Sequence, residues 1–373
     1  MKIVADDKIP YLKGVLESCA TVEYYPGKEI TSAIVKDADA LIVRTRTKCN
    51  ADLLEGSKVK FIATATIGFD HIDTAYCASK GIAWANAPGC NSGSVMQYIA
   101  STLAFLSERY RFNYSDKTLG IIGAGNVGSK VARYAKLAGL NVLLNDPPRK
   151  RAEKDKNKFV SLREIQEKAD IITFHVPLNK KGEDKTYHLA DETFFKHLRP
   201  NCILINSSRG EVVSTTALKQ ALKENKIKAA VLDVWENEPF IDKELLKMTV
   251  AGTPHIAGYS VEGKATGTVM SVQAVSRFFN LGITFNLNDI IPPPDNRIEI
   301  DCKEKNSQSI INEAVLKTCD ITIDSDLLKK FPAAFEFQRE NYRERHEFGA
   351  YKINLYNNPH NIARLLSQTG FKI

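Results

Sequence analysis

Short apolar segments alternate with longer segments of helical periodicity along most of the chain. Apolar runs of strand length occur at residues 2–6, 40–43, 61–64 and 82–85, and they indicate a first α/β unit of roughly 90 residues. Strands that alternate with helices in sequence usually form a parallel sheet with helices on its faces. The pattern therefore predicts an α/β fold.

A second α/β unit follows a long apolar helix that we expect at residues 94–109. Its first strand covers residues 119–123, and another helix at about 263–279 comes after its last strand. The remaining strands of this unit are expected at residues 142–145, 171–176, 203–206, 229–234 and about 248–251.

The end of the chain is set apart by the proline-rich run at residues 290–294, which predicts a stiff linker. Beyond it, the pattern favours a strand around 321–323 and a helix at 361–367. We interpret residues 286–373 as a small α+β domain.

The charge balance gives only a mild bias towards anionic partners. The formal net charge is +7, and the densest basic stretch, at residues 149–158, is mixed with acidic residues. It contains no interleaved aromatic side chains that could stack on bases, so no nucleic-acid partner is expected. An anionic small molecule would suit the same charge.

Composition also indicates the cellular compartment in which the protein is expected. No apolar run approaches the ~20 residues of a membrane span, and the N-terminus becomes acidic too early for a secretory signal. The seven cysteines are an odd number and form no C-x-x-C pair. This usage favours reduced thiols in the cytoplasm, with neither a membrane anchor nor a bound metal.

A G-x-G-x-x-G motif occupies residues 123–128, directly after an apolar strand and before a helical run. In this context the motif is typical of a Rossmann dinucleotide site. Gly123 would allow the tight turn, Gly125 the approach of a diphosphate, and Gly128 the packing of helix on strand. The alternative is a glycine turn without a ligand. The cofactor contacts expected here are Gly123, Gly125, Asn126, Val127 and Gly128.

The end of the next strand carries Asp146, about 20 residues beyond the glycine motif. A carboxylate at this place can accept hydrogen bonds from both ribose hydroxyls and repels a 2′-phosphate. This favours NAD over NADP, although Arg149 and Arg151 lie close in sequence. The alternative is that Asp146 only caps the turn before two prolines.

Three further segments with polar side chains follow strands of the second unit, at residues 205–210, 232–239 and 252–258. Ligands of open parallel sheets bind beyond the carboxyl ends of the strands. We therefore expect these segments to lie close to the cofactor.

Oxidation of a 2-hydroxy acid requires three side chains that these segments contain. Arg209 can hold the carboxylate and polarise the carbonyl with its bidentate guanidinium. His255 can take the hydroxyl proton near neutral pH, and Glu238 can orient and stabilise the charged imidazole. Asp233 is placed to accept a hydrogen bond from the nicotinamide carboxamide. Each residue alone has an ordinary structural explanation, and their occurrence together after a dinucleotide motif favours catalysis.

Two other histidines receive different interpretations. His71 follows a strand of the first unit and is interpreted as structural. His175 precedes Val176 and Pro177, and we expect it to shape the adenine pocket rather than to perform chemistry.

In these motifs, residues 1–285 resemble the D-isomer-specific 2-hydroxyacid dehydrogenases. The resemblance implies a substrate domain formed by residues 1–93 and 259–285, with an NAD-binding domain at 94–258 inserted and the catalytic cleft between them. The expected fold is thus two doubly wound parallel-sheet domains (Rossmann/flavodoxin-like) and a small α+β C-terminal domain at 286–373. The motifs that carry the resemblance are residues 123–128, 175–178, 207–210, 233–239 and 253–258. The cofactor contacts expected in the last four are Val176, Pro177, Ser207, Ser208, Asp233 and Gly258.

Three stretches resemble a branch of this family that acts on a phosphorylated acid. They are residues 63–71, residues 255–268, and residues 335–345, which resemble that branch's C-terminal dimerisation domain. The resemblance therefore implies a homodimer formed through the C-terminal domain. Arg343 and Arg345 are candidates to reach a neighbouring subunit's site.

The same resemblance implies substrate contacts for Thr45, Thr66 and Tyr259. Thr45 stands where a serine is common in this branch. A phosphate needs a cationic partner, and Arg44 and Arg46 flank Thr45 at a strand end. We predict both arginines as phosphate contacts, with solvent-facing side chains as the alternative.

The motifs predict NAD-dependent oxidation of a small hydroxy acid, and the resemblance implies that this acid is phosphorylated. One alternative is a dehydrogenase for another D-2-hydroxy acid, such as 3-phosphoglycerate, glyoxylate or hydroxypyruvate. A second alternative is a nucleotide-sensing scaffold similar to transcriptional co-repressors of this fold. The three intact catalytic side chains favour an enzyme.

Overall fold

The computed structural model describes residues 1–153, 158–287, 290, 296–357 and 361–373. The chain divides into two compact units. Unit 1 consists of Met1–Asn91 with Ser260–Pro293, and unit 2 consists of Ser92–Tyr259 with Pro294–Ile373. All of the predicted linker at 290–294 except Ile290 lies outside the described residues.

Unit 1 is built on a five-stranded parallel sheet of order β2-β1-β3-β4-β5. Helix α11 (Val261–Phe279) covers one face, where its Val272 and Val275 pack with Ile3 of the sheet. Alternate strand residues pack on the opposite face in a second core. Strand β3 is buried at all four positions because both faces of the sheet are covered. The remaining elements are β1 (Lys2–Asp6), β2 (Thr21–Tyr25), β3 (Ala40–Val43), β4 (Phe61–Thr64), β5 (Ala83–Ala85), α1 (Ser32–Val35), α2 (Ala51–Leu54) and α3 (Thr74–Lys80).

Unit 2 contains a six-stranded parallel sheet of order β11-β10-β9-β8-β6-β7. The chain runs from β6 to β7 at one edge and then crosses back to β8 on the other side of β6. This reversal places a ligand crevice at the carboxyl end of β6. The strands are β6 (Thr118–Ile122), β7 (Asn141–Asn145), β8 (Ile171–Phe174), β9 (Cys202–Asn206), β10 (Ile227–Leu232) and β11 (Ala251–Gly252).

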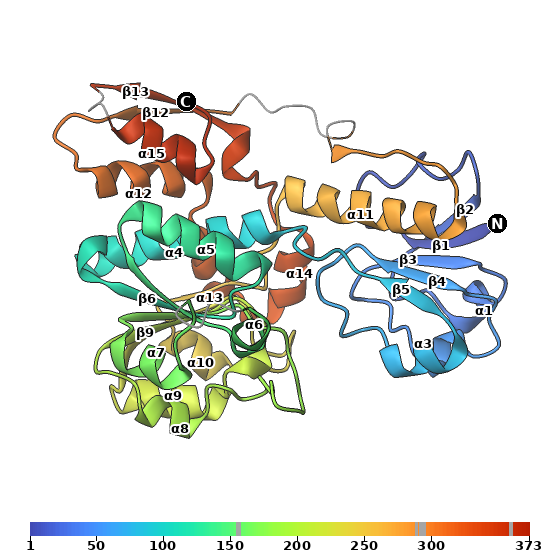
Figure 1. Cartoon of the computed structure of the whole chain (residues 1–373), viewed down its shortest axis with the longest axis horizontal. Coiled ribbons are helices and arrows are strands. Elements are labelled where there is room, and N and C mark those ends of the chain that lie inside the picture. The colour runs from blue at the N-terminus through green and yellow to red at the C-terminus, as the bar shows by residue number, and fades with distance from the viewer. Residues whose placement is uncertain (154–157, 288–289, 291–295, 358–360) are drawn as a thin grey trace. The chain divides into compact units, whose positions relative to one another are not determined.

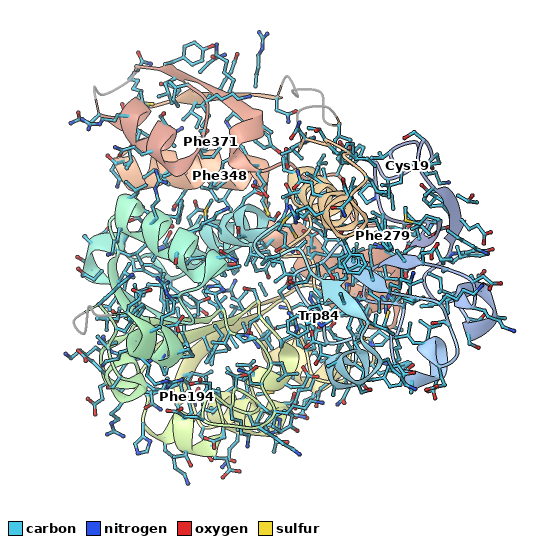
Figure 2. The ribbon with its side chains drawn as sticks, turned by 45° about the vertical axis from the view of Figure 1, so that its right-hand side comes forward. Cys19, Trp84, Phe194, Phe279, Phe348 and Phe371 are labelled. Atoms are coloured by element: carbon cyan, nitrogen blue, oxygen red, sulfur yellow. The ribbon has the colours of Figure 1, made fainter. Side chains whose placement is uncertain are left out.

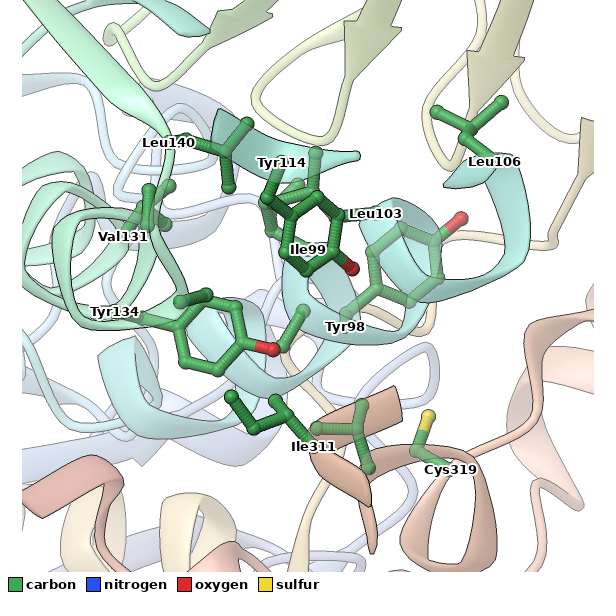
Figure 3. Packing of buried hydrophobic residues seen from close by; sticks show 14 of the residues in the cluster. Tyr98, Ile99, Leu103, Leu106, Tyr114, Val131, Tyr134, Leu140, Ile311 and Cys319 are labelled. Atoms are coloured by element: carbon green, nitrogen blue, oxygen red, sulfur yellow. The ribbon is translucent and has the colours of Figure 1, made fainter. Parts of the chain in front are cut away.

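Helices cover both faces of this sheet (Figure 1). Helices α4 and α5 pack on Ile121 and Val231, whereas Ile122 and Leu232 point into the core on the other face. Figure 3 shows Tyr98, Ile99 and Leu103 of α4 beside side chains of α5. The helices are α4 (Ser92–Tyr110), α5 (Asn126–Ala138), α6 (Pro147–Ala152), α7 (Leu162–Lys168), α8 (Glu192–Lys196), α9 (Thr215–Lys223) and α10 (Lys243–Met248), with short 3-10 helices at Tyr114–Asp116 and Gly210–Val212.

The C-terminal part of unit 2 adds a parallel strand pair and four helices. Ile311 of α12 packs in the same core as α4 (Figure 3), and Phe348 stacks on Phe371 at 4.3 Å between ring centroids (Figure 2). The elements are β12 (Asn296–Asp301), β13 (Tyr351–Tyr356), α12 (Ser307–Thr318), α13 (Ile321–Lys330), α14 (Phe335–Glu340) and α15 (Ile362–Thr369), with 3-10 helices at Pro332–Ala334 and Phe348–Ala350.

The prediction of a strand at 321–323 is wrong, because these residues begin helix α13. Asp320 caps the helix by accepting a hydrogen bond from the Thr322 N–H at 2.9 Å, and Ile321 is buried. The cap and the burial outweigh the β-preference of an Ile-Thr-Ile run. The strand expected at about 248–251 is shifted to Ala251–Gly252, since α10 continues to Met248. The division into three domains stays a prediction.

Among the helices that the structure describes, none combines the length and the apolar character of a membrane span.

Candidate active site

The glycine turn lies between β6 and α5, at the crevice that the strand order creates. Gly123 has a φ of +90°, and a Cβ there would lie 2.4 Å from the His175 carbonyl oxygen. A Cβ on Gly128 would lie 2.0 Å from the Gly123 oxygen. Both positions thus require glycine for the turn and for helix packing.

Gly125 is glycine for a different reason. A Cβ at this position would meet no described atom within 4 Å, so the turn is open on that side. Gly125 is also the N-cap of α5, and no side-chain cap satisfies the amide groups of the first turn in the described structure. An open turn in front of such amides fits a diphosphate.

Asp146 lies at the carboxyl end of β7 and contacts this turn. Its Oδ2 atom accepts a hydrogen bond from the Ala124 N–H at 2.8 Å, and its Oδ1 atom caps α6 by accepting from the Arg149 N–H at 3.1 Å. The capping role that we considered as an alternative is therefore present. It holds the carboxylate beside the glycine turn, where a ribose contact stays a prediction.

The two arginines near Asp146 have acidic partners. Arg149 pairs with Glu153, and its guanidinium carbon lies 5.4 Å from the Phe159 ring centroid. Arg151 pairs with Asp184 and with Glu183, the latter at 3.1 Å. These ion pairs reduce the positive charge that could attract a 2′-phosphate.

Two further predicted cofactor segments have features that suit a ligand. The segment at Val176 contacts the glycine turn, and the segment at Ser207 has a buried hydroxyl without a described partner. Val176 contacts the turn, since its Cγ1 atom would be 2.8 Å from a Cβ on Gly123, whereas Pro177 is exposed. The Ser207 hydroxyl is buried without a hydrogen-bond partner among the described residues, and a buried hydroxyl normally has one. A polar ligand at Ser207 would satisfy it. Ser208 instead donates to Asn206.

His175 and His71 are both held by threonines. His175 contacts the Thr173 hydroxyl at 3.1 Å, and burial lowers its pKa to about 3, so that the ring is neutral at physiological pH. His71 contacts the Thr64 hydroxyl, also at 3.1 Å.

Asp233 organises the loop that carries His255. Its Oδ1 atom accepts hydrogen bonds from the Thr253 hydroxyl at 2.6 Å and from the Ile256 N–H at 2.8 Å. Its Oδ2 atom accepts from the Ala257 N–H at 2.9 Å. Burial raises the pKa of Asp233 against the lowering effect of His255 and these hydrogen bonds. The predicted carboxamide contact stays a prediction.

The structure brings Glu238 and His255 into direct contact. The Glu238 Oε2 atom lies 2.7 Å from His255 Nδ1, and Glu238 Oε1 accepts from the Trp235 N–H at 3.0 Å. Burial by itself would raise the pKa of Glu238, but His255 and Arg339 outweigh it and leave the pKa below its usual value. The ionised carboxylate can only accept, so Nδ1 carries the proton and Nε2 is left to act as the base.

His255 also has an unusual backbone. Its φ is +58°, in the left-handed region that non-glycine residues rarely adopt. The His255 N–H donates to the Asp233 carbonyl oxygen at 2.7 Å, which holds this conformation. Strained residues of this kind are frequent at functional sites.

Trp235 connects the three predicted catalytic segments, and sequence reasoning missed it. A Cβ on Gly210 would lie 2.0 Å from the Trp235 carbonyl group, so the Arg209 segment contacts this backbone directly. The Trp235 indole N–H donates to the Thr253 carbonyl oxygen at 2.9 Å. The sequence signal that could have indicated this role is a large aromatic residue between Asp233 and Glu238.

Two neighbouring residues in sequence, Asn206 and Ser208, hold Arg209 by hydrogen bonds. The Asn206 side chain donates to the Arg209 carbonyl oxygen at 2.8 Å, and Arg209 Nη1 donates to the Ser208 carbonyl oxygen at 2.8 Å.

Four predicted substrate residues belong to unit 1 and follow β3 or β4. The Arg44 Nε atom pairs with Asp6 at 3.3 Å, and Thr45 is exposed. The Arg46 Cβ atom would lie 3.2 Å from a Cβ on Gly27. The Thr66 hydroxyl donates to the Gly68 carbonyl oxygen at 2.9 Å. Their roles stay predictions.

Tyr259 contacts the C-terminal segment of its own chain. Its hydroxyl accepts from Arg339 Nε at 3.1 Å, a contact that the sequence did not predict. Arg345 is buried and donates to loop carbonyl oxygens of the same chain, and Arg343 pairs with Asp324 at 2.7 Å. Both arginines thus have partners within their own chain, and the idea that they reach a neighbouring subunit stays a prediction.

In the described parts of the chain, no three or more His, Cys, Asp and Glu residues are grouped so that they could hold a metal ion.

Comparisons with known proteins place this geometry in a class. Residues 101–257 match the NAD binding domain of the D-isomer specific 2-hydroxyacid dehydrogenases. A D-lactate dehydrogenase from Aquifex aeolicus, solved with NAD and lactic acid, is 26% identical with a TM-score of 0.63, covering 75% of this chain and 96% of that one. A 3-phosphoglycerate dehydrogenase from Entamoeba histolytica with NAD+ bound is 26% identical with a TM-score of 0.64, covering 78% and 99%. The protein is an NAD-dependent dehydrogenase of this class, and the predicted fold class and cofactor are confirmed.

Closer relatives define the branch. The erythronate-4-phosphate dehydrogenase of Bacteroides thetaiotaomicron is 54% identical over 355 residues, which is 95% of this chain and 99% of the relative. The protein of the same name from Escherichia coli (strain ATCC 8739) is 42% identical over 376 residues, which is 100% of this chain and 98% of the relative. The chain belongs to the erythronate-4-phosphate dehydrogenase family.

Proposed function

We propose that this protein oxidises 4-phospho-D-erythronate at C2 to 2-oxo-3-hydroxy-4-phosphobutanoate, a step of pyridoxal 5′-phosphate (vitamin B6) biosynthesis. The observation that carries the proposal is the contact of 2.7 Å between Glu238 and His255 in the same loop cluster as the Arg209 segment. Relatives named for this substrate, at 42% and 54% identity, support the choice of acid.

In this mechanism, His255 Nε2 takes the proton of the C2 hydroxyl. Glu238 fixes the imidazole through Nδ1 and stabilises its charged form. Arg209 holds the substrate carboxylate and polarises the forming C2 carbonyl. When bound, NAD supplies the acceptor for the C2 hydride.

The cofactor would lie along the carboxyl ends of β6, β7 and β9. The open turn at Gly125 and the unsatisfied Ser207 hydroxyl support this placement. Asp146 would accept from the adenosine ribose, and Asp233 from the carboxamide. The full set of proposed contacts is Gly123, Gly125, Asn126, Val127, Gly128, Asp146, Val176, Pro177, Ser207, Ser208, Asp233 and Gly258.

The substrate phosphate would be bound by Arg44 and Arg46, with Thr45, Thr66 and Tyr259 contacting the rest of the acid. The ion pair with the buried Asp6 supports a fixed orientation for Arg44. It also neutralises part of the Arg44 charge, so Arg46 is included as a second cation.

The assembly and location belong to the same proposal. A homodimer through residues 286–373 is supported by large apolar side chains that are exposed on this part of the chain, at Ile323, Leu327, Phe331 and Phe337. Light scattering should give twice the chain mass of 41.5 kDa. The seven cysteines are free thiols, which suits the cytoplasm.

NADH absorbance with a panel of acids tests the proposed function. The panel contains 4-phospho-D-erythronate, D-erythronate, 3-phosphoglycerate, D-glycerate and, in the reverse direction, glyoxylate and hydroxypyruvate. We expect the highest kcat/KM with 4-phospho-D-erythronate. A higher value with another acid would assign that substrate instead, and no turnover with any acid in either direction would favour the nucleotide-sensing scaffold.

A further inference from the structure

The C-terminal segment places an arginine beside the catalytic carboxylate. Arg339, on α14, has its Nη1 atom 3.8 Å from Glu238 Oε2, the same oxygen that contacts His255 Nδ1 at 2.7 Å. Its Nε atom donates to the Tyr259 hydroxyl, and its guanidinium carbon lies 5.8 Å from the Tyr259 ring centroid. Only 13% of the Arg339 side chain is exposed. The guanidinium is thus fixed on two sides.

A second arginine from the same segment holds the backbone of the catalytic loop. Arg345 is 3% exposed and donates to the carbonyl oxygens of Ile256 at 3.3 Å, Ala257 at 2.7 Å and Tyr259 at 2.9 Å. These carbonyls belong to residues within four positions after His255. A buried guanidinium bound to several carbonyls makes the loop costly to displace, because its donors would lose their partners.

We propose that Arg339 is a positioning residue that shares the Glu238 carboxylate with His255 and thereby sets the basicity of the catalytic imidazole. This inference rests on the proposed function of the Glu238–His255 pair. The C-terminal segment then has a role in the reaction within its own chain, in addition to any role in dimerisation.

The direction of the effect follows from the charges that surround the imidazole. Among the described residues, the acidic groups Glu238 and Asp233 interact electrostatically with His255, and the cation Arg339 interacts with Glu238. Arg345 interacts electrostatically with Asp233. Arg339 disfavours the imidazolium directly and also withdraws part of the Glu238 charge from it. Removal of the Arg339 charge should therefore favour the imidazolium relative to the wild type.

The test compares Arg339→Gln with the wild type in two measurements. One is the pH profile of kcat/KM for oxidation, and the other is an NMR titration of 13C-labelled histidine, with His255 assigned from a His255→Gln spectrum. In Arg339→Gln we expect both midpoints to move to higher pH by about 0.5–1 unit, with a loss of kcat/KM of up to ~10-fold near neutral pH. In Arg339→Lys, which keeps the charge, both midpoints should lie close to those of the wild type.

The matched control is Arg343→Gln, which removes a nearby arginine that pairs with Asp324 rather than with the catalytic pair. Its midpoints should equal those of the wild type. Arg339→Met serves as a second uncharged variant if Arg339→Gln does not fold. A loss of activity or stability without any change in the His255 midpoint would show that Arg339 is merely structural and would overturn the inference.

The two readouts separate this inference from the proposed function. If the wild type oxidises none of the acids but the His255 midpoint still moves in Arg339→Gln, the function fails and the positioning role holds. If 4-phospho-D-erythronate is oxidised and the midpoint does not move, the function holds and the positioning role fails.

Discussion

His255 can act as a base at Nε2 only while Nδ1 keeps its proton and donates it to the Glu238 carboxylate in a hydrogen bond. The 2.7 Å contact and the lowered pKa of Glu238 keep this arrangement through the physiological range. In His255→Gln, kcat should fall by ~10²–10⁴, the usual contribution of a general acid–base residue. Stopped-flow or steady-state NADH absorbance measures this fall. NAD affinity, measured by fluorescence titration, should change little, and an unaltered kcat would remove His255 from the mechanism.

Asp146 offers a test of cofactor choice with its helix cap preserved. In Asp146→Asn the remaining side-chain oxygen can still cap α6, because asparagine is as good an N-cap as aspartate. The substitution removes the negative charge and the hydrogen bond from the Ala124 N–H. We expect the ratio of kcat/KM for NADP to that for NAD to rise by at least ~10-fold, since repulsion of the 2′-phosphate disappears. A constant ratio in steady-state assays would mean that Asp146 does not select the cofactor.

Two glycines of the turn between β6 and α5 should have different roles, Gly128 in folding and Gly125 in NAD binding. Gly128→Ala places a Cβ 2.0 Å from the Gly123 oxygen and should lower the free energy of unfolding by ~1–3 kcal/mol. Gly125→Ala enters open space and should keep the stability of the wild type while weakening NAD binding. Chemical denaturation and NAD titration of both variants check this. Equal stability losses, or unchanged NAD affinity in Gly125→Ala, would contradict it.

Helix α13 introduces a pH dependence of stability through Asp324. Burial raises the pKa of this carboxyl to about 6, against the effect of Arg343 and Arg345, and its Oδ2 atom has no hydrogen-bond partner among the described residues. Because the folded protein binds the proton more tightly than the unfolded chain, the contribution of Asp324 is fully present below pH ~4 and is lost as pH rises to about 6.

Denaturation as a function of pH measures this contribution. Its size is about 3 kcal/mol, since one pKa unit corresponds to ~1.4 kcal/mol. Asp324→Asn should remove this component from the difference between pH 4 and pH 6. A variant curve parallel to that of the wild type would refute the assignment to Asp324.

The elements differ in how far the sequence predicts them. Strands β3 and β4 are continuous apolar runs because both faces are buried, and they were predicted with their observed bounds. The edge strand β2 and the pair β12 and β13 are half exposed and were missed. The helix at Ile321 depends on a cap, which is a local hydrogen bond that outweighs residue preference.

The candidate site divides in the same way. Gly123, Glu238 and His255 lie in motifs at strand ends, so their segments could be predicted to meet from topology alone. The contacts of Arg339 and Arg345 with Tyr259 could not be predicted. The two arginines lie 80 and 86 positions further along the chain, and they bind a hydroxyl and a backbone carbonyl, which leave no sequence pattern.

At the scale of the whole molecule, the C-terminal residues share a hydrophobic core with helices of the NAD-binding domain. Ile310, Ile311 and Val315 of α12 are buried together with Tyr98 and Leu103 of α4. This explains why residues 294–373 form one compact unit with residues 92–259. The loop that carries His255 is thus held by Arg345 of the same compact unit.

The central claim is that hydrogen leaves C2 of the acid as hydride while His255 receives the hydroxyl proton. It is tested most directly with 4-phospho-D-erythronate carrying deuterium at C2. The account predicts that mass spectrometry finds one deuterium in each NADH formed in a single turnover. With His255→Gln, this deuterated NADH should form only at the low residual rate of that variant. NADH that forms without deuterium would contradict the account, because the oxidised carbon would then not be C2.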